Sequence, residues 1–127
     1  MEEGRILAQY QALADRLGES PAKFLVRLIL TEEELHHELL RATAKWLREH
    51  AVAEERSTPP VGSTDELLRR TEELQHHEMD TIEACRGLRS ELAGTGGALL
   101  AAVLDVMVMD SEKHHRLLTT VLKMIRG

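Results

Sequence analysis

Large apolar residues recur three or four positions apart over most of the chain, and this spacing predicts amphipathic helices. The first predicted helix covers residues 2–17, and Gly18 after it suits the left-handed position that ends many helices. Ser20 followed by Pro21 predicts that a second helix starts there and runs over residues 21–50, because serine caps helices and proline suits the first helical position. The chain therefore begins with a predicted helical hairpin.

The helical pattern stops over residues 51–63, where two prolines and a glycine predict a surface connection. A capping box beginning at Ser63 predicts a third helix over residues 64–93. A glycine-rich turn separates it from a fourth predicted helix over residues 98–125. Two antiparallel pairs, helix 1 with 2 and helix 3 with 4, joined by a longer middle connection, predict an all-α four-helix bundle that forms one domain over residues 1–127.

Composition favours packed helices, since 43% of residues are hydrophobic and 30% are charged, but only 2% are aromatic. The net charge is −6 and no stretch is densely basic, so we expect neither nucleic acid nor membrane as a partner. The single cysteine, Cys85, excludes a disulfide or a thiolate metal cluster within one chain. The N-terminus lacks a signal-peptide pattern and no apolar run approaches the roughly 20 residues of a membrane span, which together favour a cytoplasmic protein.

The second and fourth predicted helices repeat each other at an offset of 78 residues, apolar position on apolar position. In this overlay Glu34 and His37 align with Glu112 and His115. Each pair is a Glu-x-x-His, which places a carboxylate and an imidazole on one helix face within a turn. Apolar neighbours predict that both pairs face a core, where they are costly unless they pair or bind a cation. The repeat therefore predicts a metal site.

The histidines that precede these two, His36 and His114, have weaker support from the repeat. Glu33 and His36 also form a Glu-x-x-His, but the position equivalent to Glu33 is Ser111. We therefore interpret His36 and His114 as supporting or partly exposed residues rather than ligands.

The third predicted helix carries a related segment, in which Glu78 falls within the apolar stripe and His77 lies at its edge. A turn centred near residue 95 places Glu78 level with Glu112 in an antiparallel pair. We predict Glu78 as a ligand and His77 as a weaker candidate. The same reasoning for the first hairpin brings Glu3 level with Glu34.

A Glu-x-x-His on two helices with an inward glutamate on a third resembles the ligand set of ferritin-like di-iron carboxylate proteins. The run Ser111–His115 is similar to the last-helix motif of rubrerythrin-like members, and Glu34–His37 to their second-helix motif. The resemblance implies two irons per chain on the Glu-x-x-His pairs and Glu78, with ferrous-iron oxidation or peroxide reduction as the activity. The first helix departs from the pattern, so Glu3, a partner subunit or water would complete the site.

Carboxylates and imidazoles without thiolates favour iron, manganese or zinc. A redox reaction would need an external electron donor, because the chain has no Cys-x-x-Cys pair. Two other readings remain: a metal-free helical interaction module and a mononuclear zinc protein. The second predicted helix is about twice as long as the first, which leaves an apolar strip with Trp46 uncovered and predicts a homodimer.

Overall fold

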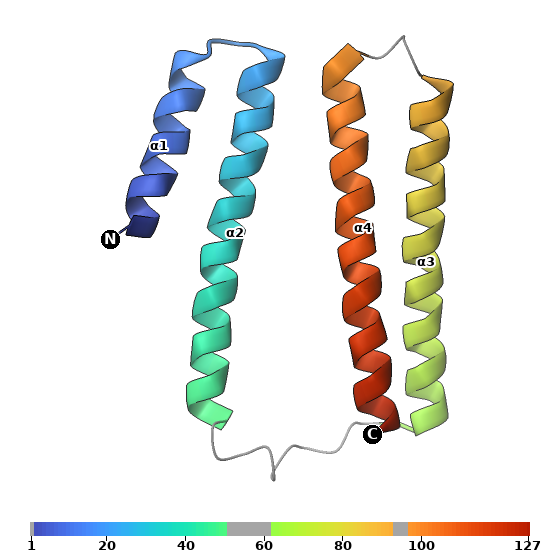
Figure 1. Cartoon of the computed structure of the whole chain (residues 1–127). Coiled ribbons are helices and arrows are strands. Elements are labelled where there is room, and N and C mark those ends of the chain that lie inside the picture. The colour runs from blue at the N-terminus through green and yellow to red at the C-terminus, as the bar shows by residue number, and fades with distance from the viewer. Residues whose placement is uncertain (1, 51–61, 93–96) are drawn as a thin grey trace. The chain divides into compact units, whose positions relative to one another are not determined.

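The chain folds into four α-helices, seen here in a computed structural model that describes residues 2–50, 62–92 and 97–127, with side chains from Gly4 onward. The contacts pair α1 with α2 and α3 with α4, forming hairpin 1 and hairpin 2 (Figure 1). The helices are α1 Glu2–Arg16, α2 Pro21–His50, α3 Thr64–Glu91 and α4 Gly97–Arg126. These bounds lie within two residues of the predicted ones, and the longest connection is the middle one, as predicted.

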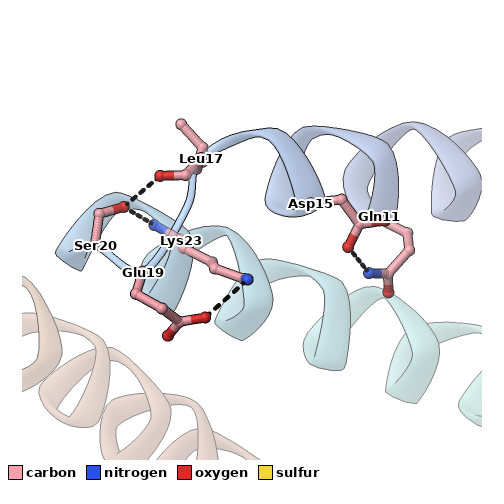
Figure 2. A network of polar contacts seen from close by, with 6 residues as sticks. All are labelled: Gln11, Asp15, Leu17, Glu19, Ser20 and Lys23. Carbon is pink, nitrogen blue, oxygen red and sulfur yellow. Dashed lines mark hydrogen bonds and ion pairs between the residues drawn. The ribbon is translucent and has the colours of Figure 1, made fainter.

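The turn of hairpin 1 and the start of α3 have the conformations that their residues predict, whereas the predicted glycine-rich turn before α4 lies outside the described residues. Gly18 has a φ of 62°, the left-handed value that favours glycine at a helix end. In Figure 2 the Ser20 hydroxyl bridges the two helices, since it accepts from the Lys23 amide at 3.2 Å and donates to the Leu17 carbonyl at 3.1 Å. The N-cap of α3 is Ser63, whose hydroxyl accepts from the Glu66 amide at 3.1 Å. The local start and stop signals are therefore confirmed.

Hairpin 2 has a small apolar core near its turn, made by Ile82, Cys85, Leu104 and Val108 with Leu100 packed against them. The α4 residues that face α3 follow a spacing of three and four, which is typical of a seam between two long helices. Further from the turn the seam becomes partly polar, with Thr71 and Ser111 buried. The candidate ligands of hairpin 2 lie between these two halves.

Hairpin 1 is less complete, because α1 has 15 residues and α2 has 30. Ala14 of α1 is fully buried, whereas α2 has no buried residue. Every residue from Glu38 to Glu49 is exposed, including the apolar Leu40 and Leu47. The second half of α2 therefore has no cover within its own hairpin.

Several large apolar residues of the predicted amphipathic helices are exposed within each hairpin. They do not lie between the paired helices but on a second apolar face, or on a polar one. They are Leu13, Phe24, Leu35, Leu39, Trp46, Leu74, Met107, Met109, Val121 and Met124. None of the described helices is long and apolar enough to cross a membrane.

Candidate metal centre

The two Glu-x-x-His pairs occupy equivalent places in the two hairpins, as the sequence repeat predicts. His37 of α2 and His115 of α4 are both half-buried, and Glu34 and Glu112 are both exposed. His115 follows Val108 and Ser111 in the three-and-four spacing of the seam, so it faces α3. In each pair the half-buried imidazole thus lies on the side of the helix that faces the rest of its hairpin. The exposed carboxylate lies at the edge of that side.

Glu78 lies on the facing side of α3, where its side chain is only 16% exposed. Its Oε1 is 3.5 Å from Nδ1 of His114, two residues beyond Glu112 on α4. The α4 residue that Glu78 contacts is therefore only two positions from Glu112, the residue predicted to lie level with it. The imidazole within reach of this carboxylate belongs to His114, which the sequence had not singled out as a ligand.

Glu112 has a positively charged environment. Its Oε1 is 3.8 Å from Nη2 of Arg86, and an open hollow of about 220 Å³ beside it is lined by Arg86, His115 and Arg116 as well as Met79 and Ile82. Two guanidinium groups repel a divalent cation, because like charges at this range oppose each other even where solvent screens them. This side of hairpin 2 is unfavourable for metal unless Arg86 swings away.

His114 lies on the opposite side of the seam, on an exposed apolar face of α4. This face includes Met107, seven residues before His114, and Leu117 and Val121, three and seven residues after it. All three are exposed. Asp110, four residues earlier, lies on the same face, and its Oδ1 accepts from Nζ of Lys113 at 3.3 Å.

The equivalent histidine in hairpin 1 also has exposed apolar neighbours. Around His36 of α2 the exposed apolar residues are Ile29, Leu39 and Leu40, and Glu32 stands four residues before it. Its Nδ1 is 3.8 Å from Oε1 of Glu33, the carboxylate that the repeat argument set aside. Both first histidines, with an acidic residue four positions earlier, thus lie within exposed apolar faces. In the sequence, the spacing of large apolar residues around each histidine indicates that it lies on an apolar face.

The two remaining candidate ligands are His77 and Glu3. His77 is exposed, and its carbonyl accepts a hydrogen bond from the Thr81 hydroxyl at 3.1 Å. The side chain of Glu3 lies outside the described residues.

Carboxylate and imidazole donors in this proportion suit a hard or borderline divalent cation. Over the described parts of the chain, however, no group of three or more histidine, cysteine, aspartate or glutamate residues is close enough to hold an ion. Glu78 with His114 and Glu33 with His36 are contacts of two residues each. Comparisons with models of protein families, with curated proteins and with solved structures found no match.

Proposed function

We propose that this chain is a metal-binding, ferritin-like four-helix bundle. The support comes from the apolar faces of the hairpins, which expose Leu35, Leu39 and Trp46 on α2 and Met107, Leu117 and Val121 on α4. Large apolar residues exposed along one side of a helix are characteristic of a face that becomes covered. Joining the two hairpins through these faces gives the bundle.

The single observation that carries the proposal is that each hairpin holds a carboxylate–histidine contact beside its exposed apolar residues. The contacts are Glu33 with His36 on α2, at 3.8 Å, and Glu78 of α3 with His114 of α4, at 3.5 Å. Once such a face is buried, carboxylates and imidazoles are costly unless a cation binds them. Glu78, His114 and His36 are therefore the ligands we favour.

The rival ligand set is the one selected by the repeat, Glu34 with His37 and Glu112 with His115. The proximity of Arg86 to Glu112 counts against it. Glu78 belongs to both sets, so it does not distinguish them.

Iron is the metal that the resemblance implies, with manganese or zinc as substitutes. A pair of bound irons supplies one-electron chemistry of the kind that oxidises ferrous iron or reduces peroxide. The protein's own contribution is to hold the ion: the carboxylates neutralise its charge, and the imidazoles bind in their neutral form.

Metal analysis of matched variants tests the proposal, on protein purified without a nickel column and loaded anaerobically with ferrous iron. We expect about two irons per chain in the wild type. His114→Ala and Glu78→Ala should bind less iron, while His115→Ala, the adjacent and chemically identical change, should bind close to the wild-type amount. Loss in His115→Ala and Glu112→Ala but not in His114→Ala would instead establish the rival set.

The same experiment separates the other classes of function. A metal-free interaction module binds no iron in any variant. A mononuclear zinc protein holds one zinc tightly and shows no absorbance change when peroxide is added. Either result overturns the di-iron proposal.

A further inference from the structure

A polar contact crosses the seam of hairpin 2 one turn from the candidate ligands. The side-chain amide of Gln75 on α3 donates to the Thr119 hydroxyl on α4 at 2.7 Å and to the His115 carbonyl at 3.4 Å. The Thr119 hydroxyl in turn donates to the His115 carbonyl at 3.1 Å. All three groups are partly buried, and together they form what we call the seam tie.

The seam tie holds the half of the hairpin that the apolar core does not reach. That core, Ile82, Cys85, Leu104 and Val108, lies on the turn side of Glu78. Apolar contacts are non-directional and hold the axial position of a helix weakly, whereas a buried polar contact is satisfied in one register only. The seam tie thus adds a directional contact to the half of the hairpin in which Leu118 is half-buried and Leu122 is buried.

The other cross-helix contacts of hairpin 2 are weaker determinants of register. Arg86 with Glu112, Arg89 with Asp105 and Arg126 with Glu72 are ion pairs between exposed side chains. Solvent-exposed pairs of this kind contribute little, since water and salt screen them. The neutral, partly buried hydrogen bonds of Gln75 are the more discriminating contact.

We propose that Gln75 and Thr119 are positioning residues, which fix α3 against α4 so that Glu78 and His114 meet. Gln75 lies one turn before Glu78, and Thr119 lies on the turn of α4 that follows His115. A slip of one helical turn, about 5 Å, would carry the Glu78 carboxylate out of reach of the His114 imidazole. The part of the proposal that concerns metal affinity depends on the proposed function, and the part that concerns register does not.

The register is tested by the distance between spin labels on Asp65→Cys and Lys123→Cys, two exposed positions of α3 and α4, in a Cys85→Ala background. We expect one narrow distance distribution. It should broaden or shift by about one turn, roughly 5 Å, in the double variant Gln75→Leu/Thr119→Val. Removing both partners leaves no unsatisfied polar group, so the variant should stay folded. The same narrow distribution in the double variant overturns the proposal.

Thr120→Val is the matched control. Thr120 is exposed and, like Thr119, donates to the carbonyl four residues before it, but no contact to α3 is lost when it is changed. We expect its distance distribution to equal that of the wild type. A broadening as large as in the double variant would assign the effect to the loss of any threonine hydroxyl and reject the seam tie.

The consequence for binding is measured with cobalt(II), whose absorption reports its coordination, at a temperature where all variants are folded. We expect the double variant to bind cobalt about tenfold more weakly or worse, as supporting residues of metal sites typically do when removed. If the distance between the spin labels changes but the cobalt affinity does not, helix register does not govern the metal site. That result overturns the part of the proposal that concerns metal affinity. If the wild type binds no cobalt or iron, the proposed function fails, and the distances alone decide the seam tie.

Discussion

The Ser20 hydroxyl acts on two helix ends at once, because it accepts from the Lys23 amide at the start of α2 and donates to the Leu17 carbonyl at the end of α1. Ser20→Ala removes both hydrogen bonds. We expect the free energy of unfolding to fall by about 1–2 kcal/mol, the upper range for one capping residue. Urea denaturation measures the change, with Ser90→Ala, an exposed position inside α3, as the control. Equal stability of the two variants would show that the bridge in Figure 2 is energetically silent.

The carboxyl group of Glu19 beside this turn carries a pH dependence. Nζ of Lys23 donates to its Oε1 at 3.1 Å, and this hydrogen bond and the charge of Lys23 lower the pKa of Glu19. Because the folded pKa is below the unfolded one, the stabilisation is present above the unfolded pKa and is lost as the pH falls through the folded pKa. Carbon-detected NMR titration should find the pKa of Glu19 higher in Lys23→Met than in the wild type. Identical titration curves would exclude this coupling.

At the scale of the helices, local signals in the sequence were sufficient to predict where each element begins and ends. Gly18, Ser20 and Ser63 act through their own backbone and immediate neighbours, so no knowledge of packing was needed. The α3–α4 alignment also followed from the turn position, as the contact between Glu78 and His114 shows.

The choice of ligand face could not be made in the same way. In α4 the apolar residues extend beyond the seam with α3, so they cover more than one face. His115 within the seam and His114 beside Met107 and Leu117 therefore both have apolar neighbours in the sequence. Arg86, 3.8 Å from Glu112, lies on another helix and more than 20 residues away, so no local pattern predicts it. Which apolar neighbours belong to which face depends on packing between helices.

The unequal helices of hairpin 1 also bear on assembly. Leu118 and Leu122 of α4 are half-buried and buried beside α3, whereas the equivalent Leu40 and Ala44 of α2 lie beyond the end of α1 and are exposed. The homodimer predicted from the sequence would cover this second half of α2.

We expect the wild type to sediment as a dimer at micromolar concentration, and Leu40→Lys/Leu47→Lys to sediment as a monomer, since two charges in an apolar interface are strongly unfavourable. Glu49→Lys changes the charge of the same exposed stretch without altering an apolar residue, and it should remain dimeric. A compact wild-type monomer would contradict the prediction.

At the scale of the whole molecule, two methionines of α4 distinguish a bundle from independent hairpins. Met107 is 44% exposed and shares the apolar face of His114, while Met109 is 62% exposed and lines a hollow with Leu117 and three charged residues, Glu112, Lys113 and Arg116. If the apolar faces join, Met107→Glu buries a charge and should lower the free energy of unfolding by at least about 2 kcal/mol. Met109→Glu, the same change on the charged face, should alter it by about 0.5 kcal/mol or less.

Guanidinium denaturation followed by circular dichroism measures both values, and the emission of Trp46, the only tryptophan, supplies a second reading. Trp46 is 54% exposed on α2, so covering the apolar faces should shift its emission to shorter wavelength than that of a water-exposed indole. Met107→Glu should return the emission to longer wavelength, although residue 107 and the indole belong to different hairpins. Independent hairpins instead predict equal, small effects of both methionine variants and an emission that neither changes. The bundle requires the two probes to respond together, whereas a dimer that covers Trp46 but not the face of α4 leaves the emission unchanged in Met107→Glu.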